Sequence, residues 1–172
     1  MTVRIERDGK VATVIHSRIE ARNAMDPDSA VALTEAFMTL DADTETSAIV
    51  FWGEGGAFCA GWDLKYAQAF TEADRFEAEI VQGLAFSQTG GPDPRGPMGP
   101  SRLEMSKPLI AAVEGPAVAG GMELALWCDV RVMAEDAYFG VYCRRWGIPL
   151  IDGGTVRLPR LVGQGRALEI IM

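Results

Sequence analysis

The stretch from Lys107 to Asp129 constrains the fold more than any other part of the chain. Its sequence is KPLIAAVEGPAVAGGMELALWCD, an apolar run followed by a Gly-Pro pair, a Gly-Gly pair and a glutamate. This order predicts a buried strand, a tight turn, and a helix whose first turn carries Glu123. Paired glycines at such a junction let a ligand approach backbone N–H groups where the helix dipole is positive. These donors suit a negative charge on a substrate oxygen, and a nearby carboxylate completes the parts that enolate chemistry beside a carbonyl needs.

A second Gly-rich stretch, GGAFCAGWDL at residues 55–64, has the same organisation. A strand ends, glycines allow a sharp turn, and a helix begins near Asp63. The backbone N–H near Trp62 is then a second donor, and two donors from separate loops form an oxyanion hole. The alternative is that both turns serve only the backbone geometry, as most Gly-rich turns do.

The rest of the chain alternates strand and helix patterns, which predicts the α/β class. Residues 3–15 alternate apolar and polar side chains around Asp8-Gly9-Lys10, which predicts a β-hairpin with the Asp-Gly pair as its turn. Asp26-Pro-Asp-Ser predicts a helix start, and the helix runs to about Leu40. Residues 90–100 are Gly or Pro at eight of eleven positions, which predicts a mobile loop. Further predicted elements are strands at 48–52, 108–113, 129–134 and 137–140, helical segments over 63–86 and 101–106, and a helix from 161 onward.

Composition narrows the classes of function. The chain has 172 residues, of which 48% are hydrophobic and 23% charged, as in ordinary globular domains. A net charge of −8 without a long basic stretch argues against nucleic acid as a partner. No apolar run approaches the roughly 20 residues that span a membrane, and the charged first strand does not resemble a signal peptide. The three cysteines, Cys59, Cys128 and Cys143, share no metal-ligand spacing and indicate a reducing cytoplasm.

Taken together, these motifs resemble the crotonase superfamily, also called the enoyl-CoA hydratase/isomerase family. The matching segments follow the family's order and spacing over nearly the whole chain. They are RNAM at 22–25, AFCAGWDL at 57–64, KPLIAAVEG at 107–115, AGGMELA at 119–125, CDVR at 128–131, FG at 139–140, GIPLIDGGTVRL at 147–158 and LVG at 161–163.

The resemblance implies a crotonase-like spiral of β-β-α units with two roughly perpendicular sheets, formed by a core domain over residues 1–172. It also implies a homotrimer or hexamer that binds an acyl-CoA thioester and needs no metal or redox cofactor. Family chains usually continue with several more helices, so we expect this domain to lack that C-terminal helical region.

The resemblance also assigns the site. Trp62 and Gly120 would supply the two N–H groups that polarise the thioester carbonyl and stabilise an enolate. The residues expected to contact the acyl-CoA are Ala24, Ala60, Trp62, Asp63, Leu64, Gly120, Gly121 and Cys143. Arg22 and Lys65 flank the expected CoA segments and could meet its phosphates, although the simpler interpretation is that both are solvated side chains.

The expected catalytic carboxylates depart from the family pattern. Hydratases use two glutamates that hold and activate a water; Glu123 matches the first, whereas Cys143 stands where the second is expected. A thiol with a pKa near 8.5 is a poor substitute for an ionised carboxylate. Asp152 lies where dienoyl-CoA isomerases and an aryl-CoA dehalogenase carry a catalytic aspartate, so it could compensate. The alternative is that Asp152 caps the turn before Gly153-Gly154.

The remaining candidates have either a structural interpretation alone or a functional interpretation beside a structural one. His16, the only histidine, is expected to have a surface or hydrogen-bonded role. Arg144, Arg145 and Trp146, which follow Cys143 directly, either shape or charge the acyl pocket or, in the alternative, belong to an inter-subunit salt bridge. Cys59 and Cys128 are expected to be small core residues.

Three functions follow from these patterns. The first is an enoyl-CoA hydratase-type lyase with Glu123 as acid and base and Asp152 assisting. The second is an enoyl- or dienoyl-CoA isomerase that moves a proton along an enolate. The third is a non-catalytic acyl-CoA-binding protein that lost its chemistry with the second glutamate, although such a protein would need neither Glu123 nor the Gly120-Gly121 pair.

Overall fold

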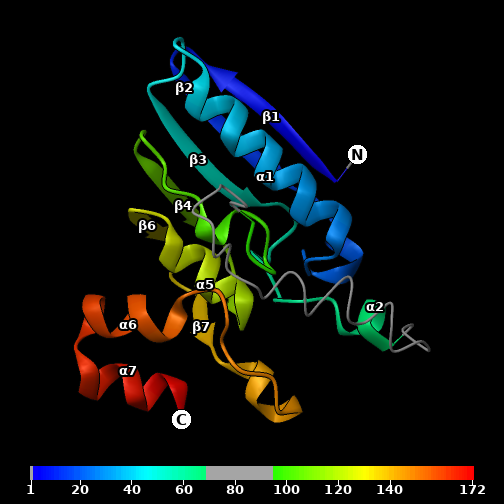
Figure 1. Ribbon diagram of the computed structural model, residues 1–172, viewed down its shortest axis with the longest axis vertical. Coiled ribbons are helices and arrows are strands. Elements are labelled where there is room, and N and C mark those ends of the chain that lie inside the picture. The colour runs from blue at the N-terminus through cyan, green and yellow to red at the C-terminus, as the bar shows by residue number, and fades with distance from the viewer. Residues whose placement is uncertain (1, 69–94) are drawn as a thin grey trace, which may run out of the picture.

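A five-stranded sheet forms one layer of the molecule (Figure 1), in a computed structural model that describes residues 2–68 and 95–172. The strand order is β1-β2-β3-β4-β6. The strands are β1 (Val3–Asp8), β2 (Val11–His16), β3 (Ala48–Gly53), β4 (Leu109–Val113) and β6 (Val130–Met133). β1 and β2 are antiparallel, and every later neighbour is parallel, so each later strand follows a crossover.

The hairpin prediction is confirmed, with its turn shifted by one residue. The two loop residues are Gly9 and Lys10, not Asp8 and Gly9, because Asp8 still pairs with Val11. Gly9 has a φ of 56°, a left-handed conformation that glycine adopts without a steric cost.

Helix α1 (Pro27–Ala42) runs along one face of this sheet (Figure 1). The Asp26 side chain accepts a hydrogen bond from the Ser29 N–H at 2.8 Å, and Pro27 occupies the first turn, as predicted. Leu33, Phe37 and Leu40 share the buried face of the helix. The Phe37 ring meets the Phe51 ring of β3 edge to face, with 5.3 Å between centroids, so this contact joins α1 to the sheet within the core.

A second, two-stranded sheet pairs β5 (Pro116–Val118) in parallel with β7 (Tyr138–Gly140). Helix α5 (Gly120–Trp127) follows β5, and α6 (Gly154–Val162) packs against α5 and α7 (Gln164–Ile171) at the lower end of the view in Figure 1. The short α2 (Leu64–Gln68) and three 3₁₀ turns, η1 (Ile19–Ala21), η3 (Pro100–Arg102) and η4 (Tyr142–Trp146), complete the described elements. Two sheets with helices between and around them confirm the mixed α/β class.

Two helix predictions are corrected, one at residues 101–106 and one from Leu161 onward. The helix expected from Leu161 begins earlier, at Gly154, and is divided in two at Gly163. Gly163 has φ 79° and ψ 157°, which no helix accommodates. The helix expected over 101–106 is wrong: only the turn Pro100–Arg102 is helical, and the backbone is extended at Leu103.

The Gly- and Pro-rich segment is ordered where the structure describes it. Gly96 and Gly99 exchange backbone hydrogen bonds of 2.8 and 2.9 Å, and Met98 between them is buried. The mobile loop predicted for 90–100 is therefore wrong for residues 95–100. The part of that prediction over 90–94, and most of the helix predicted over 63–86, lie outside the described residues.

Among the helices that the structure describes, none has the length and apolar character that crossing a bilayer requires.

Candidate active site

Two loops that precede helices are packed back to back, and they build the centre of the site. Cys59 forms a parallel bridge with Ala117, and the Val118 N–H donates to the Cys59 carbonyl at 3.0 Å. Gly121 closes the contact, because a Cβ on this residue would lie 2.1 Å from the Cys59 carbonyl oxygen. Gly121 is thus required for the approach of the two loops, and it lies behind the cavity described below.

This approach brings the N–H groups of Trp62 and Gly120 together. Gly61, directly before Trp62, lies so close to the second loop that a Cβ on it would be 3.3 Å from the Gly120 nitrogen. Within the described residues neither N–H donates a hydrogen bond. Gly120 is the first residue of α5, where the N–H groups have no partner in the helix and the dipole is positive. The pair can therefore receive an anionic or strongly polarised oxygen.

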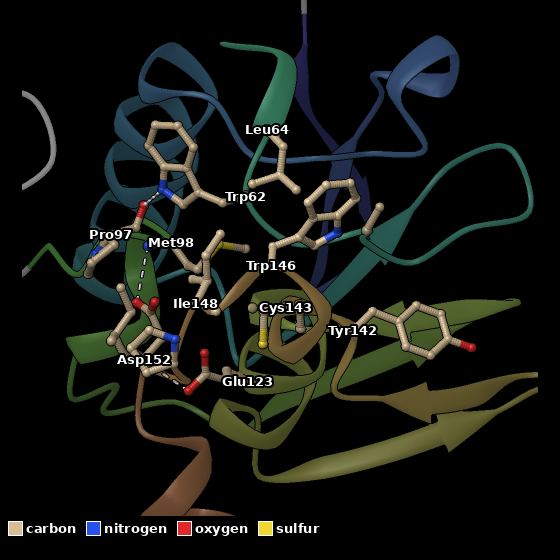
Figure 2. Close-up of a pocket in the computed structure, with 16 residues that line it drawn as sticks. Trp62, Leu64, Pro97, Met98, Glu123, Tyr142, Cys143, Trp146, Ile148 and Asp152 are labelled. Carbon is tan, nitrogen blue, oxygen red and sulfur yellow. Dashed lines mark hydrogen bonds between the residues drawn. The ribbon is translucent and has the colours of Figure 1, made fainter. Parts of the chain in front are cut away.

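Glu123 lies one turn further along α5 and is 1% exposed. Its Oε1 accepts hydrogen bonds from the Asp152 N–H at 2.9 Å and the Gly154 N–H at 2.8 Å. Figure 2 shows the other carboxyl oxygen directed into the cavity. A Cβ on Gly154 would lie 2.9 Å from Oε1, so glycine at this position lets the carboxyl group reach the backbone donors.

The environment of Glu123 suits proton transfer near neutral pH. Burial raises the pKa of its carboxyl group to about 7, the Asp152 charge adds to the increase, and the hydrogen bond from Gly154 opposes it. A group with this pKa can both take up and release a proton at physiological pH.

Asp152 lies beside Glu123 and is 3% exposed. Its Oδ1 accepts hydrogen bonds from the Met98 N–H, at 3.0 Å, and from the Ser101 hydroxyl. Burial raises the pKa of this carboxyl group above its usual range, and the hydrogen bond from Ser101 opposes the increase. Helix α6 has no side-chain cap, so the interpretation of Asp152 as a turn cap is wrong. The carboxyl group instead holds the 95–101 segment against the site (Figure 2).

Cys143 lies on η4 and lines the same cavity. Burial raises the pKa of its thiol, and the nearby Glu123 carboxylate raises it further. The thiol is therefore protonated at neutral pH and close enough to Glu123 to sense its charge. The position expected for a second glutamate does face the first, but it holds no carboxylate.

These groups surround a cavity of about 340 Å³ (Figure 2). Apart from Glu123, Asp152 and Cys143, its lining is almost entirely apolar or aromatic. The lining residues are Ala60, Trp62, Leu64, Pro97, Met98, Ala119, Gly120, Glu123, Tyr142, Cys143, Trp146, Gly147, Ile148, Pro149, Ile151 and Asp152.

Three of the residues expected to contact acyl-CoA do not line this cavity. Ala24 is buried, and its carbonyl accepts a hydrogen bond from Arg18. Asp63 forms an ion pair with Arg18 at 3.0 Å, and its side chain accepts from the N–H groups at the start of α2. Gly121 is the third, as described above. Their assignment to CoA binding stays a prediction.

The exposed cations also lie outside the cavity. Arg22 and Lys65 are exposed, so the structure leaves both of their interpretations open. Trp146 lines the cavity, as the pocket-shaping interpretation of residues 144–146 expects, whereas Arg144 and Arg145 are exposed and do not line it. Arg145 instead lies over the Tyr142 ring, 4.8 Å from its centroid.

Sequence reasoning missed one wall of the cavity. Pro97 and Met98 come from the segment predicted to be mobile, and Met98 packs so closely on Gly120 that a Cβ there would lie 2.5 Å from its sulfur. A single methionine inside a run of Gly and Pro was the only indication of packing. The ring of Trp62 is fixed to the same segment, because its Nε1 donates to the Pro97 carbonyl at 3.2 Å.

The structure contradicts the prediction that His16 has a surface or hydrogen-bonded role. The side chain is fully buried at the end of β2, and neither ring nitrogen has a hydrogen-bond partner among the described residues. Burial lowers its pKa to about 4, so the ring is neutral at physiological pH. Cys59 and Cys128 are buried core residues, as predicted.

No group of three or more His, Cys, Asp or Glu side chains within residues 2–68 and 95–172 could hold a metal ion. The expectation that the protein uses no metal stays a prediction.

Comparison with known proteins adds independent findings. A sequence model of the family described as "Enoyl-CoA hydratase/isomerase" matches residues 6–87 and 101–172. The chain is 34% identical over 175 residues to enoyl-CoA hydratase EchA19 of Mycobacterium tuberculosis, with 98% of this chain and 59% of the relative covered. It is 36% identical over 169 residues to a short-chain-enoyl-CoA hydratase of Clostridium acetobutylicum, with 97% of this chain and 59% of the relative covered. An (E)-benzylidenesuccinyl-CoA hydratase of Thauera aromatica is 33% identical over 173 residues, with 100% of this chain and 62% of the relative covered. The chain thus spans about three fifths of the length of these relatives.

Solved structures agree with this similarity. A crystal structure of an enoyl-CoA hydratase from Mycobacterium tuberculosis H37Rv superposes with a TM-score of 0.82 at 34% identity, covering 99% of this chain and 60% of the other. One from Bacillus anthracis gives a TM-score of 0.83 at 28% identity, covering 99% of this chain and 62% of the other.

Proposed function

The chain belongs to the enoyl-CoA hydratase/isomerase family, and on that premise we propose that it binds an acyl-CoA thioester and adds water across the double bond of a trans-2-enoyl group. One observation carries the proposal: a buried carboxyl group with a pKa near 7 lies in an apolar cavity that also holds two unbonded N–H donors.

In this mechanism the thioester carbonyl accepts hydrogen bonds from the N–H groups of Trp62 and Gly120. When water adds to the β-carbon, the electron pair of the double bond moves towards the carbonyl, and the resulting enolate is stabilised by these donors. The low polarity of the lining strengthens both hydrogen bonds.

Glu123 transfers the proton from the water to the substrate. Its cavity-facing oxygen removes a proton from the attacking water and then delivers a proton to the α-carbon, so that water is added without a net change in the enzyme. A single carboxyl group can serve both steps because its pKa lies near the working pH. Asp152 assists from beside Glu123, where its own burial favours the protonated form.

The cavity also supports a proposal for the acyl group. A lining of aliphatic and aromatic side chains favours an uncharged, apolar acyl chain. Relatives named for short-chain and benzylidenesuccinyl substrates make crotonyl-CoA and cinnamoyl-CoA the natural pair to compare.

The test is the loss of enoyl absorbance when the chain is mixed with crotonyl-, octenoyl- and cinnamoyl-CoA. Turnover that disappears in Glu123→Ala supports the proposal. If no enoyl-CoA turns over although a saturated acyl-CoA binds, hydration is wrong and the non-catalytic acyl-CoA-binding alternative stands. Activity that survives dialysis against a chelator supports the absence of a metal.

Isomerisation is the second candidate, favoured by the two neighbouring carboxyl groups and the absence of a third carboxylate at Cys143. It predicts deuterium exchange at the α- or γ-carbon without net addition of water. Proton NMR of the products in deuterated water separates the two reactions.

We further propose that the protein acts in the cytoplasm as a homotrimer or hexamer. Three free thiols suit a reducing compartment. Apolar side chains exposed on β6 and α6, among them Val132, Val156 and Leu161, favour self-association. Sedimentation equilibrium over a range of protein concentrations tests the assembly, and a monomer at all concentrations contradicts it.

A further inference from the structure

Arg157 joins the two segments that flank the candidate active site. It lies on α6, and its Nη1 donates to the Asp152 carbonyl at 2.6 Å while its Nη2 donates to the Ser101 carbonyl at 2.8 Å. These two carbonyls are 51 residues apart in sequence. One guanidinium group therefore links the turn before α6 to the turn that follows the Pro97–Met98 wall.

The same turn holds Glu123. The N–H groups of Asp152 and Gly154 bond to Glu123 Oε1, and the carbonyl of Asp152 bonds to Arg157. Gly153, between them, has a φ of 93°, and a Cβ on it would lie 2.5 Å from Arg157 Nη1. The guanidinium group thus packs against the turn itself, and the Gly153-Gly154 pair serves the contacts to Arg157 and Glu123.

Arg157 is also a positive charge beside the carboxyl groups. The Glu123 and Asp152 carboxyl groups and the Cys128 thiol interact electrostatically with Arg157, and Arg102 is a second cation near Asp152. Burial lowers the pKa of Arg157, and the two carboxylates oppose that effect, so the side chain stays charged. Arg157 does not line the cavity, so it acts on the chemistry only through other residues.

We propose that Arg157 is a positioning residue for the acid–base chemistry: it ties the Asp152 turn to Ser101, so that the backbone donors hold Glu123, and it supplies the positive charge behind both carboxyl groups. This inference rests on the proposed function for the identity of the proton-transfer group, Glu123.

The experiment compares Arg157→Met with Arg157→Lys, which keeps the charge but only part of the hydrogen bonding. Without the charge, the ionised form of Glu123 is less favourable. The rise of kcat/KM with pH in Arg157→Met should therefore move up by about one pH unit, whereas Arg157→Lys should stay close to the unchanged protein. Arg160→Met, an exposed arginine of the same helix, is the matched control and should leave the profile unchanged.

A direct titration makes the test independent of turnover. In protein labelled with ¹³C at the glutamate side-chain carboxyl groups, the Glu123 resonance, assigned by its loss in Glu123→Gln, should titrate about one pH unit higher in Arg157→Met. This titration is measurable even if no enoyl-CoA is hydrated, so failure of the proposed function and failure of this inference are distinct results. If Arg157→Met does not fold, Arg157→Gln, which keeps hydrogen-bond donors but carries no charge, replaces it, and the Glu123 resonance should again titrate about one pH unit higher.

An unshifted Glu123 titration in Arg157→Met overturns the proposal. So does a loss of activity that is equal at every pH and is not restored in Arg157→Lys, because that pattern describes a purely structural contact.

Discussion

At the scale of single residues, Glu123 shows a conflict between stability and chemistry. Its pKa rises from 4.5 to about 7 because the folded chain buries it. Between these values the folded state holds a proton that the unfolded state has lost, so stability falls as pH rises through this window. The ionised carboxylate costs the fold free energy, and a neutral side chain at the same place would not.

Glu123→Gln is therefore expected to slow the proposed hydration strongly and to stabilise the protein. The amide oxygen can still accept from the N–H groups of Asp152 and Gly154, so kcat should fall by about 10²–10⁴-fold while the free energy of unfolding at pH 8 rises by up to about 3 kcal/mol. Urea unfolding at pH 8 and at pH 4.5 measures the effect, and the gain should vanish at the lower pH. A variant that is less stable than the unchanged protein at pH 8 would contradict the raised pKa.

Cys143 is the residue at which the site departs most from the two-glutamate pattern. Its thiol faces Glu123 but is protonated, so it can neither hold nor activate water as a carboxylate would.

Cys143→Glu is expected to raise the rate of hydration. A carboxylate there supplies a second acid–base group on the far side of the water, and kcat should increase by about 10²-fold. The control is Cys143→Gln, which has the same length and no charge and should give no increase. Steady-state kinetics with crotonyl-CoA measure both, and equal rates in the two variants would show that the charge at this position has no role.

At the scale of elements, two helices differ in whether the glycine in their first turn is required by a tertiary contact. Gly121 and Gly165 are each the second residue of a helix, α5 and α7 respectively. A Cβ on Gly121 would meet the Cys59 carbonyl at 2.1 Å, whereas nothing lies within 4 Å of one on Gly165. The same residue type in the same helical position thus has a tertiary role in one case and only a local one in the other.

Gly121→Ala is expected to destabilise the fold by about 3 kcal/mol or more, because the two loops must separate. Gly165→Ala, its matched control, should stabilise the protein by about 0.5–1 kcal/mol through helix propensity. Thermal unfolding followed by circular dichroism compares them. Similar melting temperatures for the two variants would show that the loops are not in contact as described.

Elements could be predicted from the sequence where local patterns determine them. The hairpin, α1 and the Gly-Gly entry to α5 each carry turn or capping residues that act within a few positions, and all three were predicted. The Met98 wall was not, because a run of Gly and Pro has no local preference for packing. Its order comes from the Asp152 carboxyl group and from Gly120, which are more than 20 residues away in sequence.

At the scale of the whole molecule, His16 is expected to lower the stability of the fold in acid. Its pKa is 6.5 in the unfolded chain and about 4 in the fold, where burial is the main cause and the Arg18 charge adds to it. Between these values the unfolded state binds a proton that the folded state does not, so stability falls as pH falls through the window. The pH dependence that His16 causes is opposite in sign to that of Glu123. The measured dependence of the unfolding free energy on pH is the sum of the two.

His16→Leu is expected to remove the loss of stability that His16 causes as the pH falls. Relative to the unchanged protein, the variant should gain about 3 kcal/mol of unfolding free energy as the pH drops from 7 to 4. Chemical unfolding at half-unit pH steps measures the difference. A difference that stays constant with pH would mean that His16 is accessible to protons in the fold.

The resemblance to a known family predicted that Glu123, Trp62 and Gly120 meet in one place, whereas the sequence patterns by themselves determined the α/β class and most strand and helix positions. Short-range patterns suffice for these, because a turn, a cap or an amphipathic face is set by neighbouring residues. Only the tertiary structure decided what surrounds them: the pKa of Glu123, the attachment of Asp152 to the Met98 segment, the link made by Arg157, and the burial of His16. Each of these depends on side chains and backbone groups brought together from distant parts of the chain, and on the water excluded when they meet.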